Sequence, residues 1–122
     1  MASPGLGFFT KLLVLDRAAS EQFYERLGFV RVGADGNFLH LRWEERGEVL
    51  LVGLPTGVAF EGKRGWGVLQ CFTTAMPLEA IAEKALGAGA RVEGPEIQPW
   101  KTRELVVTDP DGYRLNFVQA LP

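Results

Sequence analysis

The chain begins with an apolar run and continues with a periodic segment typical of a helix. Residues 8–16, FFTKLLVLD, are rich in strand-forming side chains, so we expect a strand there. Asp16 is a residue type that caps helix N-termini, and the spacing predicts a helix over 17–27, ended by Gly28. The stripe of this helix that we expect to be buried consists of Ala19, Phe23, Tyr24 and Leu27.

Three more strand-like runs follow this helix. They cover residues 29–34, 37–43 and 48–54, separated by the turn signals Asp35-Gly36 and Glu45-Arg46-Gly47. The first half therefore predicts the element order βαβββ. Residues 55–66 contain Pro, several Gly and charges of both signs, which is typical of a connecting loop.

The second half repeats the order of the first. Its expected elements are a strand over 67–74, a helix over 77–89 and strands over 90–94, 102–109 and 113–119, the last two joined by Asp109-Pro110-Asp111-Gly112. The helix-ending glycines Gly28 and Gly89 lie half of the 122-residue chain apart. We therefore predict an α+β fold, a single domain over 1–122 built of two βαβββ modules (about 8–54 and 66–119) that form a curved mixed sheet or partial barrel.

Charge and hydropathy narrow the range of partners. A net charge of −2 and a pI near 5.4 lack the basic character of nucleic-acid-binding surfaces, so nucleic acid is not an expected partner. No segment approaches the about 18 apolar residues that span a bilayer, and the N-terminus lacks the pattern of a signal peptide. We expect a cytoplasmic protein with no membrane partner.

The single cysteine, Cys71, lies in the apolar stretch VLQCF. It excludes a disulfide within the chain, and we expect a small buried side chain. A nucleophilic thiolate would need a cationic neighbour, and the only histidine lies far away in the sequence.

Four short motifs and the repeated βαβββ order resemble one protein family. The motifs are FYERLGF at the end of the first predicted helix, DGNF in a hairpin, QPW before the penultimate strand and DPDGYRLNF at the end. Over nearly its whole length the chain resembles the vicinal oxygen chelate superfamily, which includes glyoxalase I, extradiol dioxygenases and fosfomycin- and bleomycin-resistance proteins. RLGF, DGNF, QPW and DPDG are most similar to the bleomycin-resistance branch.

The resemblance also implies where a metal would bind. Members with metal chemistry carry His, Glu, His or Gln, and Glu on the concave face of their first, fourth, fifth and eighth strands. The matching positions are Phe9, Val49 or Leu50, Leu69 and Asn116. Divalent ions need imidazole, carboxylate or thiolate donors, so we expect no metal and no cofactor. A register slipped by one residue would turn Gln70 or Glu48 inward instead, without adding a second imidazole.

A metal-free cavity would bind an organic ligand through apolar contact and stacking. The resemblance places Trp100 at one aromatic wall and Phe38 at the matching position on the third strand, so the two rings would sandwich a flat ligand. Alternatively, both rings seal a sheet edge or a dimer seam. Trp43 and Trp66 flank loops and belong either to the cavity rim or to the packing.

Three polar side chains each have two possible roles. Lys11 and Arg103 either line a wet cavity or extend into solvent, and His40 is either a ligand contact or a hydrogen-bonded structural residue. We predict no catalytic residue. The predicted ligand-binding set is Phe9, Lys11, Phe38, His40, Leu69, Trp100, Arg103 and Asn116.

These features favour a metal-independent small-molecule-binding protein of the glyoxalase/bleomycin resistance type. It would sequester an aromatic or antibiotic-like ligand in a cleft at a homodimer interface, because a second subunit would cover the open edges of a partial barrel. The alternatives are a metal-dependent lyase, isomerase or dioxygenase of the same superfamily, and a subunit that only scaffolds an assembly. Bleomycin is a cationic glycopeptide that a strongly acidic cleft attracts best, and this chain has a net charge of only −2.

Overall fold

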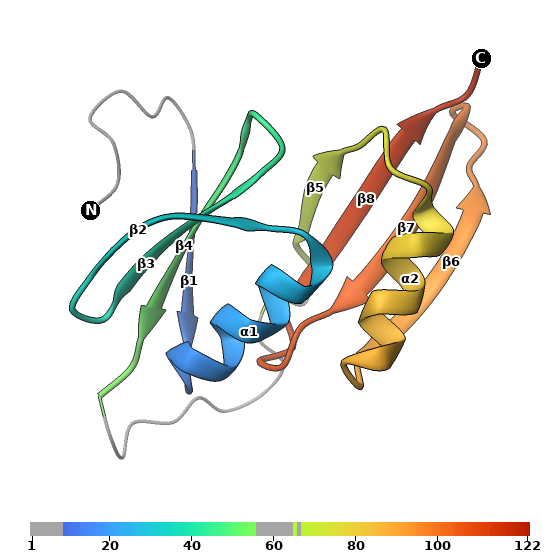
Figure 1. The fold of residues 1–122 in the computed structure, drawn as a ribbon. Helices are drawn as coiled ribbons and strands as arrows, with labels where there is room; N and C mark the ends of the chain where they lie inside the picture. Colours follow the sequence, from blue (N-terminus) through green and yellow to red (C-terminus); the bar gives the residue numbers. More distant parts are fainter. Residues whose placement is uncertain (1–8, 56–64, 66) are drawn as a thin grey trace. The chain divides into compact units, whose positions relative to one another are not determined.

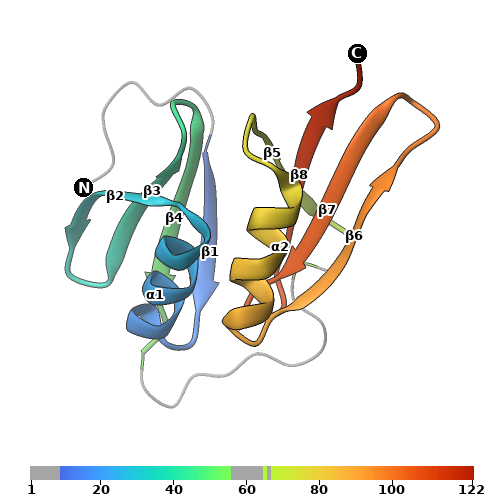
Figure 2. The same cartoon turned by 45° about the vertical axis from the view of Figure 1, so that its right-hand side comes forward.

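The structure, a computed structural model, describes residues 9–55, 65 and 67–122. The chain divides into two units, Met1–Glu61 and Gly62–Pro122, and each contains one four-stranded mixed sheet and one helix in the order βαβββ (Figure 1, Figure 2). The predicted α+β class with two βαβββ modules is confirmed. Their grouping into one domain stays a prediction, and most of the predicted loop over 55–66 lies outside the described residues.

The first unit contains a sheet covered by one helix. Its elements are β1 (Thr10–Val14), α1 (Arg17–Leu27), β2 (Val30–Asp35), β3 (Phe38–Trp43) and β4 (Gly47–Gly53). The strand order is β1-β4-β3-β2, with β1 parallel to β4 and the other neighbours antiparallel. Leu12, Leu39 and Leu51 are in register and at most 3% exposed, so strand alternation places them on the face that α1 covers (Figure 1).

The second unit repeats this topology. Its elements are β5 (Leu69–Thr73), α2 (Leu78–Gly87), β6 (Arg91–Ile97), β7 (Thr102–Thr108) and β8 (Arg114–Ala120), in the sheet order β5-β8-β7-β6. Phe72, Leu105 and Phe117 are in register and buried on the face that α2 covers, where the rings of Phe72 and Phe117 stack with their centroids 5.7 Å apart (Figure 2). The residues that alternate with these three along β5, β7 and β8 therefore place their side chains on the other face of the sheet.

Helix α1 begins and ends where the sequence predicts. The Asp16 side chain accepts a hydrogen bond from the Ala19 N–H at 3.1 Å, and Gly28 ends the helix with φ 124°. The buried stripe differs at one position: Ala19 is exposed and Ser20 is buried with Phe23, Tyr24 and Leu27. The stripe is shifted because positions 20, 24 and 27 follow the i, i+4, i+7 spacing of one helix face. In the described part of the chain, no helix has the length and apolar character that a membrane span requires.

Cys71 is exposed, so the prediction of a buried cysteine is wrong. The exposure of Cys71 follows from the alternation of side chains along β5. Phe72 is buried towards α2, so its neighbour Cys71 points to the opposite face. The predicted turn at the end of the chain is confirmed, because the Asp109 carboxylate accepts the backbone N–H groups of Asp111 at 2.9 Å and Tyr113 at 2.8 Å.

Strand β6 contains a bulge that changes which side chains share a face. Glu93 pairs with Val106 and Glu96 pairs with Glu104, so β6 has one residue more than β7 between these pairs. Residues three apart in a regular strand would face opposite sides of the sheet, whereas the extra residue turns both Glu93 and Glu96 to the face of Glu104 and Val106. Gly94 lies in this bulge with φ 93°, and a Cβ at that position would come within 2.7 Å of the Glu104 carbonyl oxygen.

We expect Gly94→Ala to lower the free energy of unfolding by about 2 kcal/mol or more, because left-handed strain of about 1–2 kcal/mol adds to the clash with the backbone of β7. Urea unfolding followed by circular dichroism measures this loss. Gly36→Ala is the matched control: Gly36 has φ 58°, and a Cβ added there would meet no described atom within 4 Å, so only the backbone strain applies. Equal losses in the two variants would contradict the role of Gly94 in holding β6 against β7.

Candidate functional site

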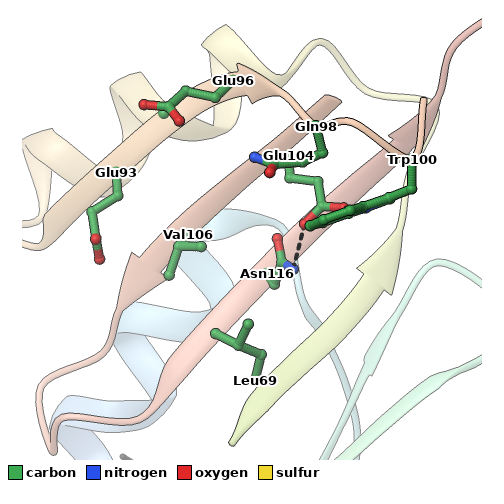
Figure 3. A pocket seen from close by; sticks show the side chains of 9 residues that line it. Leu69, Glu93, Glu96, Gln98, Trp100, Glu104, Val106 and Asn116 are labelled. Carbon is green, nitrogen blue, oxygen red and sulfur yellow. Dashed lines mark hydrogen bonds between the residues drawn. The ribbon is translucent and has the colours of Figure 1, made fainter. Parts of the chain in front are cut away.

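A hollow of about 290 Å³ lies on the face of the second sheet that α2 leaves uncovered (Figure 3). Its walls come from β5, β6, β7, β8 and the turn between β6 and β7. The residues that line it are Leu69, Glu93, Gly94, Glu96, Gln98, Trp100, Glu104, Val106 and Asn116. Its lining combines one large aromatic ring and apolar side chains with two amides and three carboxylates, so it is richer in polar groups than the mostly apolar lining typical of small-molecule sites.

The Glu104 carboxylate is the centre of the polar network in this hollow. It accepts hydrogen bonds from Asn116 Nδ2 at 2.9 Å (Figure 3), from Trp100 Nε1 at 2.9 Å and from Thr102 Oγ1 at 2.6 Å. The hydrogen bond from Thr102, followed by those from Asn116 and Trp100, lowers the pKa of Glu104, although burial opposes the shift. Glu104 is therefore ionised at neutral pH and acts only as an acceptor.

Trp100 projects from the short turn between β6 and β7. The turn is closed by the Gln98 N–H, which donates to the Thr102 carbonyl at 2.8 Å, and by the Lys101 N–H, which donates to the Gln98 carbonyl at 3.0 Å. The Trp100 side chain is 64% exposed, while its indole nitrogen is tied to Glu104. An exposed ring that is fixed at its polar edge presents its faces for stacking.

The charges around the hollow are mainly negative. Glu93, Glu96 and Glu104 line it, and Arg114 Nη2 lies 3.2 Å from Glu93 Oε2. Arg103 lies on the other face of β7, because it neighbours Glu104 in the strand, and it pairs there with Glu79 of α2. Its position gives no support to its prediction as a ligand contact.

The hollow brings together three of the eight residues that the sequence predicts for ligand binding: Leu69, Trp100 and Asn116. Reasoning from the sequence missed the carboxylates. Glu104 has a signal in the alternation of TRELVVTD, in which Leu105 and Val107 are buried and Glu104 faces the other side. Glu93 and Glu96 have no such signal in the sequence, because the alternation of apolar and polar residues does not reveal a one-residue bulge.

Four other predicted residues lie in the first unit. Lys11 and His40 are both aligned with Leu50 across β1, β4 and β3, so they share the face that α1 leaves uncovered, and Lys11 Nζ lies 5.8 Å from the centroid of the Phe38 ring. Phe9 is 39% exposed and precedes β1. The sandwich of Phe38 and Trp100 stays a prediction.

His40 is the hydrogen-bonded member of a buried charged cluster. Its side chain is 1% exposed, and its Nε2 lies 2.5 Å from Glu48 Oε1, while Arg42 Nε donates to Glu48 Oε2 at 2.8 Å. Burial alone would raise the pKa of Glu48, but the hydrogen bonds and charges of Arg42 and His40 together lower it. This partnership fits a structural role for His40.

The positions that the resemblance assigns to metal ligands do not fit a divalent ion. Leu50 lies on the uncovered face while Val49 faces α1, and Leu69 and Asn116 line the hollow. Glu48 shares the face of Leu50 without a slipped register, whereas the alternation of β5 puts Gln70 on the face of Phe72. Within residues 9–55, 65 and 67–122, no three His, Cys, Asp or Glu side chains are grouped so as to hold a metal ion.

Trp43 is 2% exposed and packs against Phe29 with ring centroids 5.0 Å apart. This burial supports a role of Trp43 in packing over a place at the cavity rim. Trp66 lies outside the described residues. Trp100 is therefore the tryptophan that the structure places at the hollow.

Comparison with known proteins finds similar solved structures, whereas no family model and no curated protein matches the sequence. An integron cassette protein from the mobile metagenome of the Halifax Harbour sewage outfall is 27% identical, with a TM-score of 0.72 over 94% of this chain and 98% of its own. A glyoxalase/bleomycin resistance protein from Streptomyces sp. CB03234 is 25% identical, with a TM-score of 0.68 over 91% and 97%. A bleomycin-binding protein complexed with bleomycin is 23% identical, with a TM-score of 0.67 over 92% and 96%. These similarities confirm the predicted fold and the resemblance to the vicinal oxygen chelate superfamily.

We expect Glu104→Gln to lower the free energy of unfolding by about 1–3 kcal/mol at neutral pH, because the amide accepts the three hydrogen bonds less strongly and adds donors of its own. The folded-state pKa of Glu104 lies below the ordinary value of 4.5, so the carboxylate stabilises the fold above that value. This stabilisation is lost as the pH falls through the lower folded pKa. Urea unfolding at a series of pH values should therefore show the two proteins converging below about pH 4.5.

Glu96→Gln is the control for this measurement. Glu96 lines the same hollow but takes no part in the hydrogen bonds to Glu104, so its substitution should change the unfolding free energy by less than about 0.5 kcal/mol. A difference between wild type and Glu104→Gln that stays constant from neutral to acidic pH would contradict the assigned network.

Proposed function

We propose that this protein binds a flat, positively charged aromatic molecule in the hollow of the second unit and holds it without transforming it. The observation that carries the proposal is Trp100: its indole N–H is anchored on Glu104 while 64% of the side chain remains exposed beside the hollow. Tryptophan is enriched at binding surfaces because it combines a large apolar ring with a polar N–H, and here the N–H is fixed while the ring faces stay available for stacking.

The size of the hollow supports a small ligand. Its volume of about 290 Å³ is just below the ~300–1,000 Å³ typical of small-molecule pockets. Leu69 and Val106 supply apolar contact in the same hollow as Trp100, so a planar molecule of two fused rings would fill much of the space. A bleomycin-binding protein of the same fold, solved in complex with bleomycin, supports an organic molecule as the ligand.

The local charge supports a cation. The overall net charge of −2 gives little attraction, but Glu93, Glu96 and Glu104 concentrate negative charge at the hollow. Grouped carboxylates raise the local concentration of a positive ligand and its association rate. Arg114 offsets part of this charge through Glu93, so the attraction centres on Glu96 and Glu104.

We further propose that the ligand is sequestered in a homodimer, with Phe38 as a second aromatic wall. Apolar side chains on or beside the edge strands support this: Leu13, Val68 and Leu69 are 36%, 54% and 43% exposed. A second copy of the chain would remove such surface from water, and a two-fold axis would create two equivalent sites.

We expect Trp100→Ala to weaken binding of protonated 4-aminoquinoline, a flat cationic probe, by about tenfold or more. Stacking contributes about 0.5–1.5 kcal/mol beyond the apolar area that the ring buries, and 1.4 kcal/mol is a factor of ten. Isothermal titration calorimetry measures the loss, and circular dichroism should show an unchanged fold because Trp100 is exposed on a turn.

Trp100→Phe is the matched control, because it keeps a stacking ring and removes the indole donor to Glu104. It should lie between wild type and Trp100→Ala. Trp43→Ala is unsuitable, since Trp43 is buried and its loss would unfold the first unit. Wild-type affinity in Trp100→Ala would refute the proposal, and stoichiometric Zn, Ni, Mn or Fe in the purified protein would favour the metal-dependent alternative.

Sedimentation equilibrium tests the proposed dimer. We expect a species of twice the 13.4 kDa of one chain at micromolar concentration. Leu69→Glu should shift this equilibrium towards the monomer if β5 lies at the interface, because it would place a charge in an apolar contact. A wild-type protein that sediments as a monomer would contradict the dimer and leave the hollow of the second unit as a site within one chain.

A further inference from the structure

The Asn116 amide has one atom that donates a hydrogen bond to Glu104 and one buried atom that has no hydrogen-bond partner in the described part of the chain. Asn116 is only 4% exposed and lines the hollow. Its Nδ2 donates to Glu104 at 2.9 Å and lies 3.7 Å from the Cys71 sulfur. Its Oδ1 is buried, and within the described residues it has no hydrogen-bond partner.

Glu104 decides which way this amide points. Its ionised carboxylate has no proton to give, and it already accepts from Trp100 and Thr102. A flipped Asn116 would bring two acceptor oxygens together, so the nitrogen must face Glu104 and the oxygen must face away from it. In Figure 3 the amide oxygen lies on the side of the amide between Glu104 and Val106, two residues that line the hollow.

Within the described residues, no group donates a hydrogen bond to this oxygen. Asn116 pairs across the sheet with Cys71 and Val106, and Glu104 is an acceptor. Leaving a buried carbonyl oxygen without a donor is unfavourable, and natural proteins retain such atoms where a ligand or a water molecule completes them. A site built to pair a buried polar group also rejects analogues that cannot pair with it.

We infer that Asn116 Oδ1 accepts a hydrogen bond from an N–H group of the bound molecule, which makes Asn116 a specificity-determining residue. The ligand is then a planar cation with an N–H donor at its inner edge, such as an aminoheteroaromatic or an amidine. Stacking on Trp100 and the attraction of the carboxylates are common to all flat cations, whereas Asn116 separates those with a donor from those without. This inference rests on the proposed binding of a flat cation at Trp100.

Two probes of similar shape and equal charge isolate the donor. Protonated 4-aminoquinoline has N–H groups at its edge, and N-methylquinolinium has none. We expect wild-type protein to bind the first about tenfold or more tightly than the second in isothermal titration calorimetry.

Two variants assign this preference to Asn116. Asn116→Leu removes the acceptor oxygen together with one donor to Glu104, so the preference should fall to nearly one. Thr102→Val removes a different donor to Glu104 at nearly constant shape and leaves Oδ1 in place, so both probes should weaken together while their ratio is kept. Asn116→Ala tests the same point with a smaller side chain if Asn116→Leu does not fold.

Each outcome is decisive. A wild-type preference that Asn116→Leu or Asn116→Ala abolishes and Thr102→Val retains supports the inference. Equal affinities in the wild type, or a preference that both Asn116 variants keep, overturn it and leave binding at Trp100 intact, because a water molecule then satisfies Oδ1. A preference that Thr102→Val abolishes equally overturns it in favour of an effect through Glu104. Probes that bind equally well to wild type and Trp100→Ala overturn the proposed function and the inference together.

Discussion

The Glu104 carboxylate holds the hollow of the second unit together. It receives hydrogen bonds from a turn, from its own strand and from the neighbouring strand, through Trp100, Thr102 and Asn116. A neutral acceptor would bind these three donors more weakly, and an apolar residue would remove the acceptor that they share. The negative charge is therefore required for the geometry: it fixes the edge of one aromatic ring and the direction of one amide.

The bulge in β6 adds a second constraint, because it decides how many carboxylates reach the hollow. Glu93 and Glu96 share a face only because one extra residue lies between their pairs with β7. Gly94 makes the close approach to the Glu104 backbone possible, so the residue that anchors Trp100 also sits beside the bulge that brings the other two charges in. The first unit has a shift at the corresponding place, between Arg31 and Gly33 of β2.

Periodicity in the sequence predicts the βαβββ order, the ends of α1 and the last hairpin turn, since each rests on local chemistry such as the Asp16 cap. Periodicity fails where the face that a side chain occupies depends on how its strand pairs with the neighbouring strands. Cys71 lies within an apolar run, yet alternation turns it away from the core. Trp100 is predictable through the resemblance, whereas Glu93 and Glu96 depend on pairing with β7. A linear pattern carries no record of such pairing.

The two units use one framework for different chemistry. Leu50 pairs with Lys11 and His40 in the first sheet, and Asn116 holds the corresponding central position between β5 and β7 in the second. Around Leu50, the carboxylate of the buried Glu48 is hydrogen-bonded by His40 and Arg42. Around Asn116, the glutamate is satisfied by neutral donors and keeps its full charge, and one amide oxygen is left over. The first cluster is buried, with the His40 side chain 1% exposed, whereas the second lines a hollow and leaves an acceptor and negative charge for a molecule from outside.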